Sequence, residues 1–307
     1  MRNIIMEGGL VAPLVATGCM RLAELNKSQV SALVHASIES QGNFFDLADI
    51  YGDGRCEELF GEVLQSETDI DREDLIIQTK CGIRKNPYRY DLSPEYIHQS
   101  IEGSLRRLKC DYIDIFTLHR PDILTSWVEI ADALMEEHHL GHIRHVAVSN
   151  FSVNQIKALG CHLGIPICAN QLQLSLVHAP IVAASFENNM YETDGVGSAL
   201  GLHDYCVNHD VVLQAWSPLQ KSNWGGLFLA DSNYAHLNQL LQHLGDKYNC
   251  TPAAVAAAWV LTISGKNQVI SGTTSVTHLK EFMQAGDLVL EHEDWYELYV
   301  AAGHRLP

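Results

Sequence analysis

The sequence has no apolar run approaching the roughly 20 residues that a membrane-spanning helix needs. Its first nine residues include an early glutamate and no long apolar segment, so no signal peptide is visible. Basic residues are scarce, because 20 lysines and arginines stand against 37 aspartates and glutamates, for a net charge of −17. Nucleic acids and anionic membranes attract basic proteins, so we expect neither as a partner. We expect a cytoplasmic protein.

Motifs that bind metals are also lacking. The eight cysteines are scattered singly without a C-x-x-C pair, which argues against zinc ribbons and thioredoxin chemistry. The sixteen histidines form no His-x-His and no H-E-x-x-H motif, so we expect no metal. We interpret the cysteines as free thiols in a reducing compartment, mostly packed as small hydrophobic residues.

Apolar strand-like runs alternate with helix-length segments along most of the 307 residues. Strands are expected at 10–18, 44–47, 74–80, 112–118, 145–148, 165–169, 211–215 and 268–270. Helices are expected at 26–41, 56–64, 93–108, 126–139, 152–159, 251–264, 276–284 and 293–302. This alternation is typical of βαβ units around a parallel sheet.

Eight such units at this length favour a closed (β/α)8 TIM barrel, with an open doubly wound sheet as the alternative. No linker or low-complexity stretch divides the chain, so we expect a single domain over residues 1–307. Long excursions are expected at 179–201 and 220–233, where clear periodicity is missing.

The segment 43–54 joins a short apolar strand to a turn rich in glycine. Asp46 stands where that strand ends, and Tyr51 stands in the loop beyond it. Lys80 ends the next strand, and because an unpaired ammonium is costly to bury, we expect it to pair with Asp46. Taken alone, this motif also fits an aspartate that caps a helix and a tyrosine that packs on the surface.

Polar side chains recur at the carboxyl end of nearly every expected strand. In a parallel barrel these ends lie on one face, and active sites occupy that face. The residues concerned are Asp46, Lys80, His119, Ser149, Asn150, Gln171, Trp216, Ser217 and 271–274.

The chemistry of four of these side chains suits proton transfer. A free phenol has a pKa of about 10, too high for an efficient proton relay at neutral pH. The Lys80 cation favours the phenolate, so we expect it to lower the pKa of Tyr51. Asp46 would keep Lys80 charged and aimed, and His119 could hydrogen-bond an oxygen beside the phenol. A general acid next to such a donor suits a carbonyl substrate, or its alcohol in reverse.

These residues resemble the aldo-keto reductase family, whose catalytic tetrad is Asp, Tyr, Lys and His. The tetrad matches Asp46 and Tyr51 in Asp-Leu-Ala-Asp-Ile-Tyr-Gly, Lys80 in Gln-Thr-Lys-Cys-Gly, and His119 in Leu-His-Arg-Pro-Asp. Further similarity at 148–151, 170–171 and 215–219 extends the likeness over most of the chain. Within the family, the chain resembles the bacterial YdhF-like reductases.

The resemblance implies a (β/α)8 barrel with extra loops and a C-terminal helix. It implies a monomeric NAD(P)-dependent oxidoreductase without metal, which reduces small aldehydes and ketones by hydride transfer while Tyr51 protonates the oxygen. A cofactor-binding sensor or regulatory protein of the same fold, with little turnover, is the alternative. A metal-dependent barrel hydrolase is a third reading.

The resemblance also implies a set of cofactor contacts. Ser149, Asn150 and Gln171 would hold the carboxamide, and Trp216 would stack on the nicotinamide ring. The remaining contacts would be Gly18, Cys19 and Met20 near the ring and ribose, Ser217 and Leu219 near the pyrophosphate, and Ser271, Gly272, Thr273 and His278 at the adenosine end.

The adenosine end departs from the family pattern. Many members have a lysine and an arginine there for the 2′-phosphate of NADP, whereas Gly272 and His278 fill those positions here. Lys280 could reach the phosphate instead. NADP(H) is therefore the expected cofactor, and NAD(H) stays open.

Three other features receive simpler interpretations. The glycine-rich run 195–201 looks like a dinucleotide fingerprint, but no strand precedes it and its third glycine comes one position late. Arg106 and Arg107 are interpreted as a solvated helix face. Candidates for the walls of the substrate pocket are Met20, Trp224 and Phe228.

Overall fold

The computed structural model describes residues 2–186, 199–222 and 225–306. Its centre is a closed barrel of eight parallel strands in the order β10-β11-β12-β3-β4-β5-β8-β9. These strands are β3 Val15–Gly18, β4 Phe44–Asp46, β5 Ile76–Cys81, β8 Ile113–Leu118, β9 Ile143–Ser149, β10 Ile167–Gln173, β11 Val212–Trp216 and β12 Asn267–Ser271. The predicted (β/α)8 barrel is confirmed, and the open sheet is excluded.

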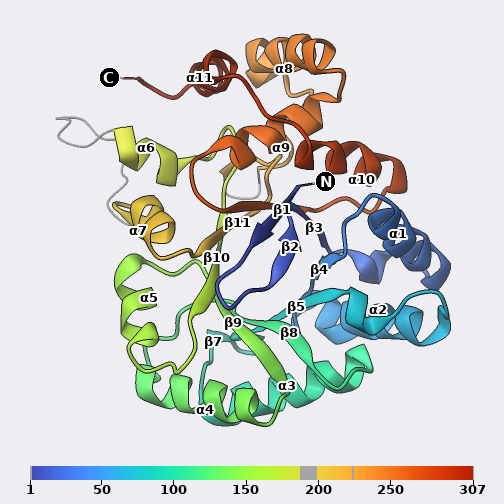
Figure 1. Cartoon of the computed structure of the whole chain (residues 1–307), viewed down its shortest axis with the longest axis vertical. Helices are drawn as coiled ribbons and strands as arrows, with labels where there is room; N and C mark the ends of the chain where they lie inside the picture. Colours follow the sequence, from blue (N-terminus) through green and yellow to red (C-terminus); the bar gives the residue numbers. More distant parts are fainter. Residues whose placement is uncertain (1, 187–198, 223–224, 307) are drawn as a thin grey trace.

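Helices surround the barrel on its outside (Figure 1). The helices that connect successive barrel strands are α1 Lys27–Glu39, α2 Arg55–Ser66, α3 Pro94–Leu108, α4 Trp127–His139, α5 Val153–Gly160, α6 Pro180–Phe186, α7 Leu202–Asn208, α8 Ala235–Tyr248 and α9 Pro252–Thr262. After the last strand come α10 Val276–Met283 and α11 His292–Ala301. Each helix of the described chain is too short or too polar to cross a bilayer.

Local sequence signals explain where several helices begin. Asn26 accepts a hydrogen bond from the backbone of Gln29, whose side chain accepts one back from the Asn26 backbone. Ser126 and Ser152 build the same capping box at α4 and α5. The first orphan donors of these helices are thereby satisfied.

The C-terminal helix packs against α8 and α9 on the outer side of the barrel. The rings of Trp259 on α9 and Trp295 on α11 are stacked, with centroids 4.9 Å apart. Each indole N–H donates to the other residue's backbone carbonyl, at 3.1 and 2.9 Å. The expected C-terminal helix is present, whereas α8 was not anticipated.

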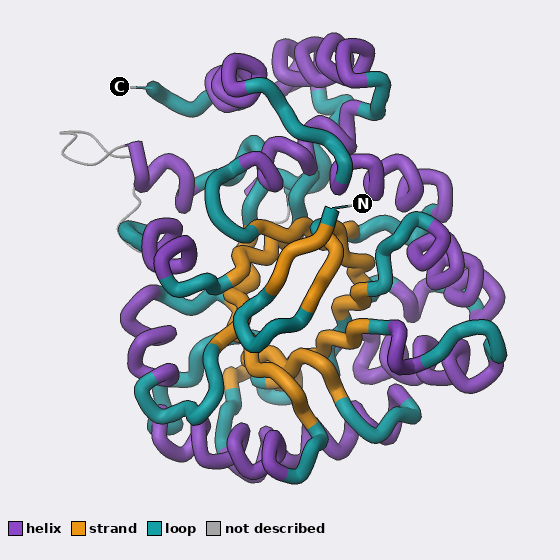
Figure 2. Tube along the Cα trace, viewed as in Figure 1, coloured by secondary structure: helices purple, strands orange, loops and turns teal. Residues whose placement is uncertain are grey.

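The expected strand over 10–18 is wrong as a single element. β2 Val11–Pro13 pairs antiparallel with β1 Asn3–Ile5, and only β3 enters the barrel. Pro13 has no N–H for a continued ladder, which explains the break. Figure 2 shows this hairpin lying across one end of the barrel. A second unforeseen hairpin, β6 Ile83–Lys85 with β7 Tyr88–Tyr90, follows β5.

The structure describes part of each expected excursion. α6 begins the first, and the remainder to residue 198 lies outside the described residues, together with most of the glycine-rich run. Gly201, the last residue of that run, caps α7. The second excursion contains a short antiparallel bridge between Gln220 and Leu227, and Trp224 lies outside the described residues.

A buried ion pair joins α2 to α3 on the outside of the barrel. The Glu57 carboxylate is fully buried and accepts hydrogen bonds from Thr79 Oγ1 at 2.6 Å and from Arg107 Nε at 2.7 Å. The prediction of a solvated face is therefore wrong for Arg107, although Arg106 is exposed. Helix packing brings a buried acid from α2 against α3, and this partner is not visible from α3 alone.

Removing Arg107 should destabilise the fold strongly, because Glu57 would remain buried without its cation. We expect Arg107→Ala to lower the free energy of unfolding by about 3 kcal/mol. The matched control Arg106→Ala should change it by less than about 0.5 kcal/mol. Urea unfolding followed by circular dichroism measures both values, and equal effects would contradict this role.

Candidate active site

The Lys80 ammonium is the centre of a polar cluster at the carboxyl end of the barrel. Lys80 is fully buried on β5 and lies 2.8 Å from the carboxylate of Asp46, the last residue of β4. It also donates to the Leu47 carbonyl at 2.7 Å and to the Tyr51 hydroxyl at 3.2 Å. Each of its three hydrogens therefore has an acceptor. The predicted Asp46–Lys80 pair is confirmed.

Tyr51 is held by a tight turn. Gly52, Asp53 and Gly54 have φ values of 57°, 55° and 91°, so the predicted turn is left-handed throughout. The loop before it is anchored at Asp49, whose backbone N–H donates to the Lys80 carbonyl at 3.0 Å. Strand and helix contacts thus fix the loop that carries the phenol.

The Asp49 side chain ties the same loop to α3. One of its oxygens accepts hydrogen bonds from Tyr96 Oη at 2.8 Å and Ser100 Oγ at 2.9 Å. Burial raises the pKa of Asp49 to about 6, against the effect of these two hydrogen bonds. Sequence reasoning missed this link between the loop and α3.

His119 directly follows β8, and its ring lies beside the phenol. The His119 and Tyr51 ring centroids are 5.9 Å apart and the ring planes are nearly perpendicular, at 84°. Burial, together with the charges of Lys80 and Arg120, holds the pKa of His119 well below its usual range. The imidazole is therefore neutral at physiological pH. Its Nδ1 is buried and has no hydrogen-bond partner among the residues that the structure describes.

Burial and neighbouring charges have opposing effects on the pKa values of Lys80 and Tyr51. Burial favours neutral Lys80, but Asp46 and Tyr51 outweigh it and raise the lysine pKa. Burial raises the pKa of Tyr51 above its usual value, the Lys80 cation opposes this rise, and the Asp46 charge adds to it. The prediction of a lowered Tyr51 pKa is therefore wrong in net direction, because desolvation of the phenolate exceeds the effect of Lys80.

Inside the barrel, an apolar layer is followed by polar side chains towards the carboxyl end. On β5 the side chains of Ile76, Gln78 and Lys80 share one face because side chains alternate along a strand. Ile76 belongs to the apolar cluster inside the barrel, and Gln78 and Lys80 follow it towards the carboxyl end. Barrel interiors are usually filled by branched apolar residues, so the amide layer beneath the ammonium is unusual.

Four buried glutamine amides form that layer. Gln78 and Gln171 donate to Asp46 Oδ1 at 2.6 and 3.1 Å, and both also donate to Gln214 Oε1, at 3.0 and 3.3 Å. Gln214 Nε2 donates back to Gln78 at 3.0 Å and to Gln268 at 2.8 Å. Asp46 thus receives two amide donors besides the ammonium, which holds its carboxylate in one orientation.

The amide network ends at the other end of the barrel, where Gln268 Nε2 donates to the Pro13 carbonyl at 2.7 Å. Of the four glutamines, only Gln171 was named from the sequence, and it was expected to contact the carboxamide of the cofactor. The alternation of side chains along a strand could have revealed two of the others. Gln78 lies two positions before Lys80, and Gln214 lies two positions before Trp216, so each shares a strand face with an expected site residue.

Gly18, Cys19 and Met20 lie at the end of β3 beside Asp46. Gly18 allows β3 and β12 to approach closely, since a Cβ there would collide with the Ser271 carbonyl oxygen. The Cys19 N–H donates to the Asp46 carbonyl at 2.9 Å, and burial raises the pKa of its thiol well above the usual value. Met20 is 44% exposed at this rim.

The residues expected around the nicotinamide come from three neighbouring strands. Ser149 Oγ donates to the Gln171 carbonyl at 3.0 Å, and Asn150 Nδ2 donates to Ser149 Oγ at 2.8 Å. Asn150 and Ser217 both have left-handed backbones, with φ of 61° and 52°. Such conformations are uncommon outside glycine and cluster at functional sites. Trp216 ends β11 next to Ser217.

Leu219 is partly buried against the hydrophobic core, whereas Phe228 is fully buried and packs on Tyr234. The suggestion that Phe228 lines the pocket is therefore wrong, because its ring belongs to the hydrophobic core.

The expected adenosine end lies after β12. Ser271 is buried, Thr273 N–H approaches Ser271 Oγ at 3.5 Å, and His278 is exposed in the first turn of α10. The Arg21 guanidinium donates to the Gly272 carbonyl, a contact that sequence reasoning missed. The two residues are 251 positions apart, so no local pattern reveals it.

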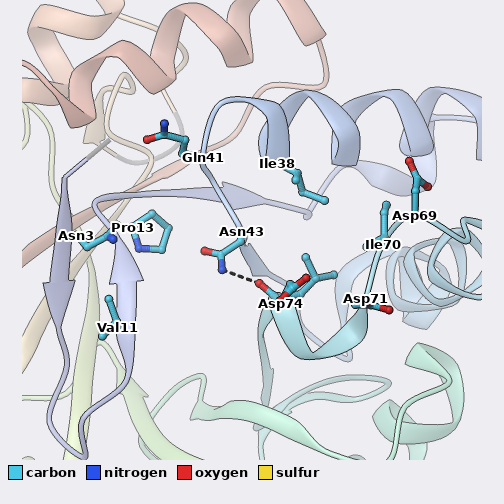
Figure 3. Close-up of a pocket in the computed structure, with 11 residues that line it drawn as sticks. Asn3, Val11, Pro13, Ile38, Gln41, Asn43, Asp69, Ile70, Asp71 and Asp74 are labelled. Carbon is cyan, nitrogen blue, oxygen red and sulfur yellow. Dashed lines mark hydrogen bonds between the residues drawn. The ribbon is translucent and has the colours of Figure 1, made fainter.

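The cavity in Figure 3 lies at the opposite end of the barrel. It has a volume of about 470 Å³ and is lined by residues of the N-terminal hairpin together with the segments that enter β4 and β5. Asp69 at its edge forms a group with His35 and Glu67 whose ligand atoms lie within 4.8 Å of one another. This group is remote from the cluster around Lys80 and takes no part in it.

The acid–base side chains lie at the carboxyl rim of the (β/α)8 barrel, where the active sites of barrel enzymes are found. The model of the aldo/keto reductase family matches residues 15–300. The chain is similar to a 6-dehydroglucose reductase of Novosphingobium aromaticivorans, with 34% identity covering 100% of this chain and 97% of that one. It is also similar to oxidoreductase YdhF of Escherichia coli, with 29% identity covering 94% of each.

Among solved structures, the thermostable aldo-keto reductase Tm1743 in complex with epalrestat shares the fold. Its TM-score is 0.78 at 23% identity, covering 98% of this chain and 100% of that one. The chain belongs to the aldo/keto reductase family and is an oxidoreductase. The predicted family and enzyme class are therefore confirmed. Members of this family use nicotinamide cofactors and small carbonyl substrates.

The lowered pKa of His119 has a measurable consequence. In an NMR titration, His119 should stay neutral well below pH 6.5, whereas His35, whose pKa is raised by the Ser31 carbonyl, should titrate above it. Because the unfolded chain binds this proton near pH 6.5 and the folded chain does not, His119 should destabilise the fold as the pH falls below that value. A His119 resonance that titrates at 6.5 or higher would overturn this account.

Proposed function

We propose that this protein reduces small aldehydes or ketones to alcohols with NADP(H). One observation carries the proposal: the Lys80 ammonium contacts both the Asp46 carboxylate and the Tyr51 hydroxyl, and the His119 ring lies beside that hydroxyl. A phenol, a buried cation and a neutral imidazole suit the protonation of a developing alkoxide.

When bound, a reduced nicotinamide supplies a hydride to the carbonyl carbon. The Tyr51 hydroxyl donates its proton to the carbonyl oxygen, and the Lys80 ammonium stabilises the phenolate that is left. Asp46 keeps Lys80 charged and directed at the phenol. His119 donates a hydrogen bond from Nε2 to the same oxygen, because a neutral tautomer with its proton on Nε2 leaves no N–H at the buried Nδ1.

The raised pKa of Tyr51 is compatible with this role. A phenol that is buried remains fully protonated at neutral pH and is ready to donate. Lys80 interacts more strongly with the phenolate than with the phenol, so its charge favours the transition state over the ground state.

The cofactor would be held by the residues at the ends of β3, β9, β10, β11 and β12. Arg21 supports NADP(H) over NAD(H), because its guanidinium reaches the Gly272 carbonyl and brings a cation to the expected adenosine end. Lys280 is engaged with Glu39 at 2.8 Å, but this exposed pair is weak and could yield to a phosphate.

Two relatives are named 6-dehydroglucose reductase, so an aldehyde derived from a sugar is the first substrate to test. A single-domain monomer is part of the proposal, by analogy with the family.

Replacing the phenol tests the proposal. Tyr51→Phe should lower kcat for aldehyde reduction by about 10²- to 10⁴-fold, since the proton donor is lost. Cofactor binding, measured by protein fluorescence, should be unchanged, and wild type and variant should both bind NADPH more tightly than NADH.

The control is Tyr296→Phe on α11, which should retain wild-type kcat. Near wild-type turnover by Tyr51→Phe would remove the mechanism, and tighter binding of NADH would remove the cofactor preference. Cofactor binding by the wild type without turnover of any aldehyde would favour a sensor instead.

A further inference from the structure

Two loops beside the tetrad form one rim of the barrel mouth. Residues 82–92, which contain the β6–β7 hairpin, follow Lys80, and residues 119–125 begin with His119. The Leu92 N–H donates to Asp122 Oδ2 at 3.0 Å and joins the two loops. Lys85 Nζ contacts Asp53 Oδ1 at 2.5 Å, so the hairpin also reaches the turn after Tyr51.

This rim is basic in an acidic protein. The two loops carry four basic and two acidic residues, whereas the whole chain has 20 basic and 37 acidic ones. Three of the four cations are engaged. Arg84 and Arg89 lie 2.9 and 3.8 Å from Asp91, and Lys85 pairs with Asp53. The fourth is Arg120.

Arg120 directly follows His119 and is half-buried. Across the described residues 2–186, 199–222 and 225–306, its guanidinium has no hydrogen-bond or ion-pair partner. The acidic residue of its own loop, Asp122, is buried and accepts instead from Leu92, Leu124 and Thr125, at 3.0, 2.9 and 2.9 Å. A guanidinium cannot shed its proton, so a half-buried one without a partner favours an anionic ligand.

The position of Arg120 identifies which ligand this is. In the closed barrel, β5 and β8 lie across from β11 and β12. The expected contacts to the cofactor phosphates follow β11 and β12, at Ser217, Leu219 and 271–273. Arg120 therefore lies on the other side of the mouth, away from these contacts and next to the histidine that faces the phenol.

We propose that Arg120 binds a carboxylate or phosphate group of the carbonyl substrate and gives the enzyme a preference for anionic aldehydes or ketones. The inference rests on the proposed reductase function and adds the charge of its substrate. Arginine forms paired, charge-assisted hydrogen bonds with either anion, which makes Arg120 a determinant of specificity.

The test compares matched substrates at saturating NADPH. One pair is succinic semialdehyde against butanal, and the other is glyceraldehyde 3-phosphate against glyceraldehyde. The readout is the ratio of kcat/KM for the anionic over the neutral member. In the wild type, at least one pair should give a ratio of about 10 to 100, as a charge-assisted hydrogen bond provides, and this ratio should fall as salt is added.

Arg120→Gln should bring that ratio close to 1, and Arg120→Lys should retain part of it because the charge is kept. Arg106→Gln, an exposed arginine of α3, is the matched control and should keep the wild-type ratio. The pair with the larger ratio identifies the anion as carboxylate or phosphate.

A wild-type ratio near 1 in both pairs, with clear turnover, would overturn the inference and leave the reductase function standing. So would an unchanged ratio in Arg120→Gln. Absence of turnover with all four compounds would instead overturn the proposed function itself.

Discussion

The buried ammonium of Lys80 is the interaction on which this site depends. A lysine without water is stable only when acceptors replace its hydration, and here a carboxylate, a carbonyl and a phenol do so. β4 and β5 are neighbours in the barrel, which brings Asp46 to the ammonium, and the turn after β4 returns Tyr51 to it. The Lys80 nitrogen therefore connects the end of β4 with the Tyr51 phenol.

The amide layer beneath Lys80 extends this constraint through the barrel. A carboxylate that faces a single cation could rotate, whereas Asp46 also accepts from Gln78 and Gln171. Because Gln214 links these two amides, the orientation of Asp46 is coupled to three strands. A polar network in a barrel core is costly unless its donors and acceptors have hydrogen-bond partners, and a fully paired network is rigid. Rigidity here serves the alignment of the cation with the phenol.

Much of this arrangement could be predicted from sequence, for identifiable reasons. Alternating strands and helices indicated the barrel, and the cost of burying an ammonium predicted the Asp46–Lys80 pair. Contacts between distant segments could not be predicted, since the Arg107–Glu57 pair depends on helix packing and Arg21–Gly272 on barrel closure. The net direction of the Tyr51 pKa was mistaken because it depends on how much water the fold removes.

The central claim is that the Lys80 charge stabilises the Tyr51 phenolate against desolvation. It is tested most directly by titrating Tyr51 with ¹⁹F NMR in protein labelled with fluorotyrosine, in wild type and in Lys80→Met. The account predicts a higher Tyr51 pKa in Lys80→Met, since burial would then act without the opposing cation. An unchanged or lower pKa in that variant would contradict it.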